Sequence, residues 1–474
     1  MLDRLRERLR EWLRLTTPVD PEFVAALDRR WAELPEAIRT PGQVLGRFAP
    51  GCEGTHGVFP ACDLACTPCY HSRDANRVRV DGPHTLERVE EQMVLLRALR
   101  GPHAHAQLIG GEVTLLPPDD HAAALGIMRR HGREPMSMSH GDVDYDYDYL
   151  ERLVLGPDGR RRLDRVSFAG HFDSLMFGRR GIPRPPDEAS LHPYRRRFVA
   201  RFRRLRDEHG VRFFLAHNMT VTPANVGQVA EVVRATSRMG FGMLSFQPAA
   251  HLGDQRRWRE GYRSADAGPD AVWAEIERGA GTRLDHRTLQ NGDPRCNRTA
   301  YGFVVGQRWV PFLDPDDPRD LAVREEFFRS LRGVGVGGTP PVVLAVKLVR
   351  LAAARPKTAV VALGWAGRAV RRAGGVRALL GGRPRPVTFV MHNFMDAADV
   401  APAWELMQRG ETAHDPRLRE TQERLAACHY AMAHPETGSL VPACVQHGVL
   451  DPGENAALRR LLPIAEIRTG RTTG

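Results

Sequence analysis

The sequence predicts an α/β fold in which parallel βα units form an open sheet or a partial barrel. Its 474 residues, 42% hydrophobic and 26% charged, have the balance of a globular protein long enough for two or three domains. Between residues 57 and 250, short apolar runs alternate with longer amphipathic runs. The chain has no run of 18 uncharged apolar residues and no secretory signal pattern, which predicts a cytoplasmic protein without a membrane-spanning helix.

Residues 1–48 form a helical N-terminal segment in this prediction. Leu2, Leu5, Leu9 and Leu13 fall on one helical face, and arginines occupy the others. Two interpretations remain open. The helix either docks on the rest of the protein or lies as a basic amphipathic helix on a membrane surface.

Residues 49–250 form the predicted core, with six strands and five helices between them. The strands are expected over 57–62, 105–110, 135–139, 165–169, 212–217 and 241–247. The helices are expected over 85–100, 119–131, 145–155, 193–209 and 224–239. In parallel βα folds the chemistry gathers at the carboxyl ends of the strands, so candidate site residues are sought there.

Three further segments follow: a connecting region over 251–326, a basic insert over 327–386 and a cysteine-bearing segment over 387–474. The net charge of +11 is concentrated in the insert, because no Asp or Glu occurs between Phe327 and Met395. Residues 340–385 are predicted to form a helical hairpin of mixed basic and aliphatic character. This hairpin would contact an anionic membrane surface, at the inner membrane, or cover the mouth of the sheet. Nucleic acid is disfavoured, since Trp365 is the only aromatic residue available there for stacking.

The cysteines carry the most specific signal. Cys62, Cys66 and Cys69 have the spacing C-x3-C-x2-C, which suits three irons of a 4Fe–4S cluster and leaves the fourth iron open. A structural zinc site with His71 as fourth ligand is the alternative. Gly110, Gly111 and Glu112 end the next predicted strand, where glycines permit close backbone approach and a carboxylate suits an ammonium group.

The triplet and the GGE motif together resemble the radical S-adenosylmethionine (SAM) superfamily. Further motifs narrow the resemblance to one branch of this superfamily. They are HFDSL at residues 171–175, SFQP at 245–248 and HNFMDA at 392–397, together with the positions of Cys296, Cys428 and Cys444. These islands resemble the branch that contains the tetraether lipid synthases and the class D-type radical SAM methylases.

The resemblance implies a partial (β/α)6 radical SAM barrel with N-terminal helical and C-terminal cysteine-bearing extensions. It implies a 4Fe–4S cluster on the triplet, SAM held by Gly110, Gly111 and Glu112, and a flavodoxin- or ferredoxin-type electron donor. Such an enzyme generates a 5′-deoxyadenosyl radical. The expected reaction is C–C bond formation or methylation at an unactivated carbon of a lipid or another small molecule. The alternatives are a peptide-modifying maturase with an auxiliary cluster and an RNA-modifying enzyme.

Three further side chains are candidates at strand ends. His171 and Asp173 follow the fourth predicted strand and are expected to contact SAM or substrate as catalytic residues. Gln247 ends the sixth predicted strand and is a candidate for cofactor binding.

Four cysteines remain outside the triplet: Cys52, Cys296, Cys428 and Cys444. Four thiolates are what a second iron–sulfur cluster or a rubredoxin-like mononuclear iron needs. The alternative is four separate buried thiols that pack as small hydrophobic side chains. His429 and His447 are potential replacements for a thiolate ligand.

Overall fold

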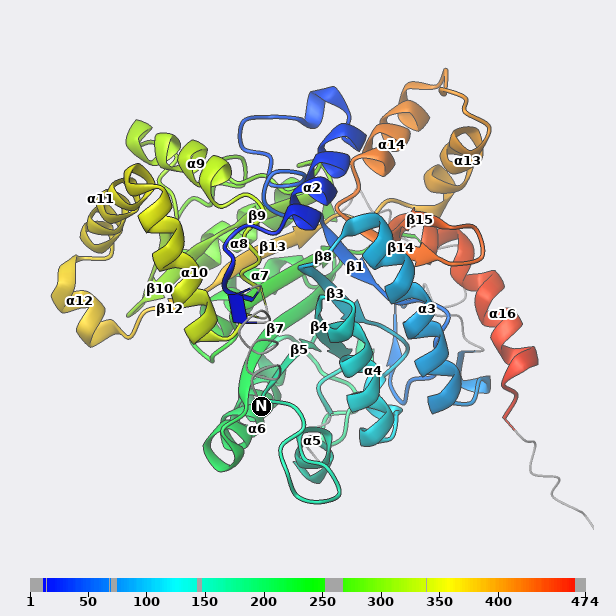
Figure 1. The fold of residues 1–474 in the computed structure, drawn as a ribbon. Coiled ribbons are helices and arrows are strands. Elements are labelled where there is room, and N and C mark those ends of the chain that lie inside the picture. Colours follow the sequence, from blue (N-terminus) through cyan, green and yellow to red (C-terminus); the bar gives the residue numbers. More distant parts are fainter. Residues whose placement is uncertain are drawn as a thin grey trace, which may run out of the picture.

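The computed structural model describes residues 12–13, 15–67, 69, 75–142, 147–251, 267–337 and 339–464. Its centre is a ten-stranded sheet in the order β15-β14-β1-β3-β4-β5-β7-β8-β13-β9 (Figure 1). Every neighbouring pair from β14 to β13 is parallel, and only the edge strands β15 and β9 run antiparallel. The predicted α/β class with a mainly parallel sheet is therefore confirmed.

Six of these strands, with the helices that connect them, form the core predicted for 49–250. The strands are β1 (Cys52–Gly54), β3 (Ala104–Leu108), β4 (Arg133–Ser139), β5 (Arg165–His171), β7 (Arg212–Val221) and β8 (Met243–Pro248). The helices are α3 (Gly82–Arg100), α4 (Pro118–Arg130), α5 (Tyr147–Val154), α6 (His192–His209) and α7 (Val229–Thr236).

The prediction of a first strand over 57–62 is wrong. The strand is β1, five residues earlier in the chain, and it pairs with β3 on one side and with β14 on the other. Residues 57–62 form an irregular segment that makes backbone hydrogen bonds to the residues just after β3. Phe59 O accepts from Gly111 N, and Ala61 O accepts from Glu112 N, both at 2.8 Å. Bonds of this kind hold a loop against a strand end and do not build a ladder.

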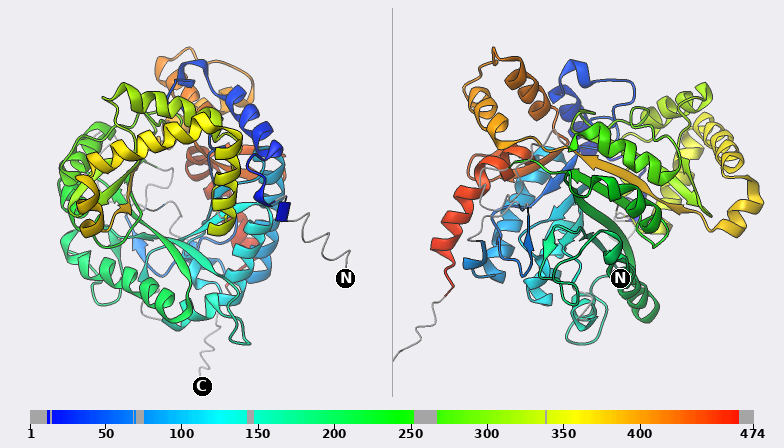
Figure 2. Two further views of the ribbon diagram at one scale, coloured as in Figure 1. Left: turned by 60° about the vertical axis from the view of Figure 1, so that its left-hand side comes forward. Right: turned by 180° about the vertical axis from the view of Figure 1, so that it is seen from behind.

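The helices begin and end where local sequence supplies the caps. The Asp81 side chain accepts a hydrogen bond from His84 N at the start of α3, and Gly101 ends that helix with a φ of 69°. Successive helices from α3 to α8 (Pro269–Ala280) pack against one another. In the left view of Figure 2 the helices form a ring around the strands.

Alternate residues of each strand face opposite sides of the sheet. One side packs against the helices and forms the main hydrophobic core, with Leu108, Phe168, Leu215, Phe246 and Phe389 among its buried residues. The other side lines a cavity through residues of the opposite parity, which include Gln107, Met138, Ala169, Asn218, Ser245 and His392. Because one cavity contacts strands from β1 to β13, the sheet curves around it.

The C-terminal segment completes this sheet. Here β13 (Thr388–His392) extends it beyond β8, and β9 (Asn297–Ala300) caps that edge. At the other edge β14 (Tyr430–His434) pairs with β1, and β15 (Ser439–Pro442) follows. The helices of this segment are α13 (Ala397–Gln408), α14 (Pro416–Ala426), α15 (Ala443–Val445) and α16 (Asp451–Leu461).

The basic insert forms three helices, α10 (Pro341–Ala354), α11 (Pro356–Arg372) and α12 (Gly375–Gly382), beside α9 (Pro318–Ser330). After α12, β12 (Arg385–Pro386) joins a small sheet with β10 (Gly302–Val305) and β11 (Arg308–Pro311). A two-stranded pairing of β2 (Ala65–Cys66) with β6 (Met176–Phe177) lies elsewhere.

The insert lies at the amino-terminal edge of the parallel sheet. Lys347 Nζ donates to Gly335 O at 3.4 Å, and Gly335 in turn lies against the ring of His103, which directly precedes β3. Arg385 Nη1 donates to Arg238 O, a few residues before β8. The alternative in which the insert covers the mouth at the carboxyl ends of the strands is therefore wrong.

At the N-terminus, α2 (Pro21–Glu33) packs on α3. Leu2, Leu5 and Leu9 lie outside the described residues, whereas Leu13 lies in a short helical stretch and is exposed. Among the helices that the structure describes, none combines the length and the apolar character needed to cross a bilayer.

Candidate functional site

The three cysteines of the triplet lie in the loop that follows β1, at the carboxyl ends of the parallel strands. Cys62, Cys66 and Cys69 are all partly buried and all line the cavity enclosed by the sheet, the main cavity of the protein. Cys66 belongs to β2, whose pairing with Met176 of β6 ties the loop to the segment after β5. The Cys62 backbone N–H donates to Asn76 Oδ1 at 2.9 Å. His71, the proposed fourth zinc ligand, lies outside the described residues.

The GGE motif lies directly against this loop. A Cβ atom added to Gly111 would fall 1.9 Å from Ala61 O, and one added to Gly110 would fall 2.9 Å from Phe59 O. The two glycines therefore let the loop that carries the cysteines approach the end of β3. Gly110, Gly111 and Glu112 line the main cavity together with the cysteines, as the sequence predicts for residues of one site.

Glu112 is 1% exposed and its carboxylate is held by several donors. Oε1 accepts from Thr114 N at 3.0 Å and from Thr114 Oγ1 at 2.7 Å, while Oε2 accepts from His140 N at 2.7 Å. The His140 ring also donates to Asp63 Oδ1 at 2.7 Å. Burial lowers the pKa of His140, but the carboxylates of Glu112, Asp63 and Asp142 outweigh it and raise the pKa overall. His140 thus lies between the carboxylates of Asp63 and Glu112, next to Cys62.

His171 and Asp173 lie together at the end of β5. His171 Nε2 is 2.7 Å from Asp173 Oδ2 and 3.1 Å from Thr220 Oγ1. Asp173 is 1% exposed and also accepts from Leu175 N and Thr220 N. Burial raises the pKa of Asp173, but His171 and these backbone donors lower it overall, so the group is a carboxylate. Both residues line the main cavity, with the His171 ring the more exposed of the two.

Gln247 also lines the cavity, at the end of β8, with Nε2 3.5 Å from Ser245 Oγ. Asn218 and Thr220, which were not predicted as site residues, face the same cavity from β7. The predicted strand ended at residue 217, whereas β7 continues to Val221. The alternation of the polar Asn218 and Thr220 with the apolar Met219 and Val221 is the sequence signal for this extension.

The cysteines outside the triplet divide between two places. Cys52 lines the main cavity, where its Sγ is 3.5 Å from His105 Nδ1. Cys296, Cys428 and Cys444 line a smaller adjoining cavity, called here the cysteine pocket. Burial raises the pKa of Cys444, and the neighbouring thiols of Cys428 and Cys296 raise it further. The structure therefore brings three of the four together, and Cys52 lies close enough to Cys428 for their charges to interact.

Two unbonded nitrogens and a cation accompany these thiols. Within the described residues, His429 Nδ1 and Asn297 Nδ2 are buried without a hydrogen-bond partner, and both residues line the cysteine pocket. Burial lowers the pKa of His429 to about 3, which keeps its imidazole neutral and able to ligate a metal. Burial raises the pKa of Cys296 to about 11, although Arg424 Nε, 3.1 Å from Cys296 Sγ, lowers it in part. His447, the other potential substitute for a thiolate, lines the main cavity.

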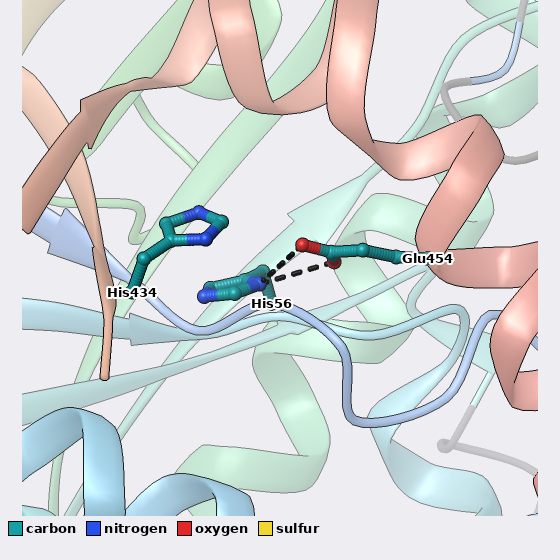
Figure 3. Close-up of side chains that lie close together, drawn as sticks. All are labelled: His56, His434 and Glu454. Carbon is teal, nitrogen blue, oxygen red and sulfur yellow. Dashed lines mark hydrogen bonds and ion pairs between the residues drawn. The ribbon is translucent and has the colours of Figure 1, made fainter. Parts of the chain in front are cut away.

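A third group of potential ligands is His56, His434 and Glu454 (Figure 3). His56 Nδ1 lies 3.0 Å from both Glu454 oxygens, and Nε2 lies 2.7 Å from Ala433 O. The His434 ring stacks on His56 at a centroid distance of 4.0 Å. Because both nitrogens of His56 face acceptors, the ring is a cation in an ion pair with Glu454 and leaves no lone pair for a metal.

Comparisons with known proteins give a limited result. No family model matches the chain, and no curated protein matches it. A structure of native anSMEcpe with bound AdoMet is similar at 14% identity and a TM-score of 0.30, over 48% of this chain and 57% of that chain. A structure of the same protein with bound AdoMet and Cp18Cys peptide gives 14% identity and a TM-score of 0.28 over the same shares. The chain thus spans a little over half the length of these structures, and at such TM-scores the similarity decides neither fold nor chemistry.

Proposed function

We propose that this protein is a radical SAM enzyme. The observation that supports the proposal is the meeting of three thiols with the GGE motif in one cavity, at the carboxyl ends of parallel strands. The six strands from β1 to β8, which curve around that cavity, would then be the partial (β/α)6 barrel expected of such an enzyme.

The thiols fit a cluster better than a single ion. Thiolates around one tetrahedral ion, each about 2.3 Å from it, lie about 3.8 Å from one another. In the described part of the chain, Cys62, Cys66 and Cys69 do not form a group whose ligand atoms all lie within 4.8 Å of one another. Thiolates that each bind a different iron of a 4Fe–4S cluster are spaced more widely. When such a cluster is bound, its chemistry is one-electron reduction of SAM to give a 5′-deoxyadenosyl radical.

The chain's own residues would bind and orient the reactants. Cys62, Cys66 and Cys69 would hold the cluster, and the segment Gly110, Gly111 and Glu112 would receive the SAM amino group beside it. His171, held by the Asp173 carboxylate, presents its partly exposed ring to the cavity as a contact for SAM or substrate. Gln247 would supply a neutral polar contact from β8, the last of the six strands that line the cavity.

The substrate we propose is a lipid or another molecule that reacts at an unactivated carbon. Deeper along the strands the cavity wall is apolar and formed by Met136, Met138, Ala169 and Met243. Such a wall suits an aliphatic chain, and methionine side chains adapt to irregular shapes. Methylation or C–C bond formation at that chain are the reactions proposed.

A second iron site is proposed in the cysteine pocket, on Cys296, Cys428 and Cys444. The fourth ligand would be Cys52, whose thiol interacts electrostatically with that of Cys428, or Nδ1 of His429, which has no hydrogen-bond partner. Buried polar atoms normally have hydrogen-bond partners, so two buried nitrogens without partners beside three thiols fit a pocket shaped to hold a metal group.

Metal content and SAM cleavage test the proposal together. The anaerobically prepared protein should bind iron and sulfide and release 5′-deoxyadenosine from SAM on reduction. Replacing Cys62, Cys66 and Cys69 by Ala should remove about four irons and abolish 5′-deoxyadenosine formation. Replacing Cys296, Cys428 and Cys444 by Ala is the matched control, and it should leave the first cluster while removing any second one. Bound zinc without iron, or unchanged SAM cleavage in the first variant, would overturn the proposal.

A further inference from the structure

Exposed apolar side chains are concentrated on the basic insert. Of the sixteen large hydrophobic side chains that are exposed among the described residues, eight lie between residues 336 and 380. They are Val336, Val342, Leu348, Val349, Val360, Leu363, Val376 and Leu380. Leu380 is 79% exposed, Val342 74% and Leu363 73%. Scattered single apolar residues need no explanation, but a concentration of this kind marks an interaction surface.

The three insert helices form the outer margin of the molecule, on the left in Figure 1. One side of α11 is fixed to α9: Thr358 Oγ1 donates to Glu326 Oε1 at 2.6 Å, and Arg368 and Arg372 both pair with the buried Asp320. The opposite side of α11, with Lys357, Val360, Gly364, Gly367 and Arg371, is exposed. That spacing of three and four residues makes one continuous helical face.

The positive charges of the insert divide in the same way. Lys347 is buried, and Arg350, Arg355, Arg368 and Arg372 bond to other parts of the chain. Lys357, Arg371, Arg377 and Arg383 remain exposed beside the apolar side chains. No acidic residue occurs between Phe327 and Met395 to neutralise them. The exposed surface of α10–α12 is thus both aliphatic and cationic.

The N-terminal stretch adds further exposed apolar side chains beside the basic insert. Arg350 Nη1 of α10 donates to Thr16 Oγ1 at 2.7 Å, which ties the N-terminal stretch to the insert. In that stretch Trp12, Leu13 and Leu15 are exposed by 47%, 40% and 46%. Two segments more than 300 residues apart in the chain therefore add apolar surface at one end of the molecule.

We propose that the exposed surface of α10–α12, together with Trp12, Leu13 and Leu15, docks on an anionic lipid bilayer. Aliphatic side chains on short helices partition into the boundary between headgroups and acyl chains, and nearby lysines and arginines bind anionic headgroups. The proposal does not depend on the proposed reaction, since it concerns the edge of the sheet opposite the cluster loop.

Other partners fit this surface less well. Single-stranded nucleic acid needs several exposed stacking rings. Among the described residues of this surface only the Trp12 ring is exposed, because Trp365 packs against Phe312 at 4.7 Å and donates to Phe312 O. An acidic electron-donor protein needs access to the cluster loop, and the insert lies at the other end of the strands. A second copy of this chain is the remaining occupant and is an outcome of the test below.

Vesicle flotation of the full-length protein tests the proposal. The probes are vesicles of phosphatidylcholine alone and vesicles in which roughly a third of the lipid is phosphatidylglycerol. Wild type should float with the anionic vesicles and not with the neutral ones. Replacing Lys357, Arg371 and Arg377 by Gln should weaken partitioning about fivefold for each lost charge. Val360→Asp with Leu363→Asp should abolish flotation.

Matched controls separate docking from folding. Val94→Asp, at an exposed aliphatic residue of α3, and Arg160→Gln, at an exposed arginine of a turn, should float like wild type. All variants should keep the thermal unfolding midpoint of wild type, because the substituted side chains are exposed. Equal flotation on neutral vesicles would overturn the proposal. So would a wild-type dimer in sedimentation that Val360→Asp with Leu363→Asp dissociates, without vesicle binding.

Discussion

Buried carboxylates in the candidate site are held by donors of the chain itself. Glu112 accepts from Thr114 and from the His140 backbone, and Asp173 accepts from His171, Leu175 N and Thr220 N. A buried carboxylate without such partners would take up a proton, because desolvation disfavours its charged form. The bonds therefore fix both groups in place before any ligand arrives, which is the condition for orienting a reactant, and they lower the pKa of Asp173.

Replacing Asp173 by Asn tests this orientation at the level of one residue. The amide nitrogen cannot accept from the donors at Thr220 N or His171, so the His171 ring loses its fixed position. We expect 5′-deoxyadenosine formation to fall by about 10- to 100-fold, the usual effect of a lost orienting group. Since Asp173 has a lowered pKa, its stabilising effect is present above about pH 4 and is lost as the pH falls through its folded-state pKa. The unfolding free energy of Asp173→Asn should therefore depend less on pH in acid than that of wild type.

The cluster loop shows what local sequence does and does not predict about an element. Cys62, Cys66 and Cys69 line the same cavity as Gly110, Gly111 and Glu112, as their positions at predicted strand ends led us to expect. The strand assigned to residues 57–62 was wrong, because its apolar run packs under the site without joining the sheet. The hydrophobic pattern of a segment indicates which of its residues are buried. It does not indicate with which strand the segment's backbone forms hydrogen bonds.

Gly111 is the position where this loop can be tested. A methyl group there would overlap Ala61 O at 1.9 Å, so Gly111→Ala should displace the backbone between Phe59 and Cys62. We expect loss of the iron bound by the triplet, and of SAM cleavage, in a protein that remains folded by circular dichroism. Gly126→Ala on α4 is the matched control, since a Cβ there meets nothing within 4 Å. That variant should keep its iron and become more stable by up to about 1 kcal/mol, and normal iron content in Gly111→Ala would contradict the model of a tight contact.

The basic insert shows a second feature that the sequence pattern of an element does not predict: which of its charged side chains are bound within the fold. The sequence predicts a helical hairpin over 340–385, whereas the structure has three helices there. The charge pattern also did not distinguish the arginines that bind α11 to α9 from those that face outward. That difference depends on Asp320, which lies 48 residues before Arg368. Pairs this far apart in the chain leave no periodic signal.

For the whole molecule, the main surprise is that the C-terminal segment belongs to the same sheet as the core. Strand β14 lies directly beside β1, although nearly 380 residues separate them, and it is followed by Cys444 of the cysteine pocket. The sequence showed the cysteines of this segment but not where it pairs, since strand pairing between distant segments depends on the complete fold. The consequence is that β1 and the cluster loop depend on residues after 430 for their support.

The ion pair between His56 and Glu454 tests this dependence, because it joins the loop after β1 to α16 (Figure 3). Burial lowers the pKa of His56, but Glu454 and the Ala433 carbonyl raise it above its ordinary value of 6.5 overall. A base with a raised folded-state pKa adds stability that is complete below about pH 6.5 and is lost as the pH rises through the folded-state value. Glu454→Gln should therefore lower the unfolding free energy by about 1.5–3 kcal/mol at pH 6 and by much less at pH 9. Denaturant unfolding at the two pH values measures the difference, and Glu405→Gln, at an exposed residue of α13, should change neither. An equal loss of unfolding free energy at both pH values would contradict this prediction. It would mean that Glu454 stabilises the protein by packing alone and not through an ion pair with a charged His56.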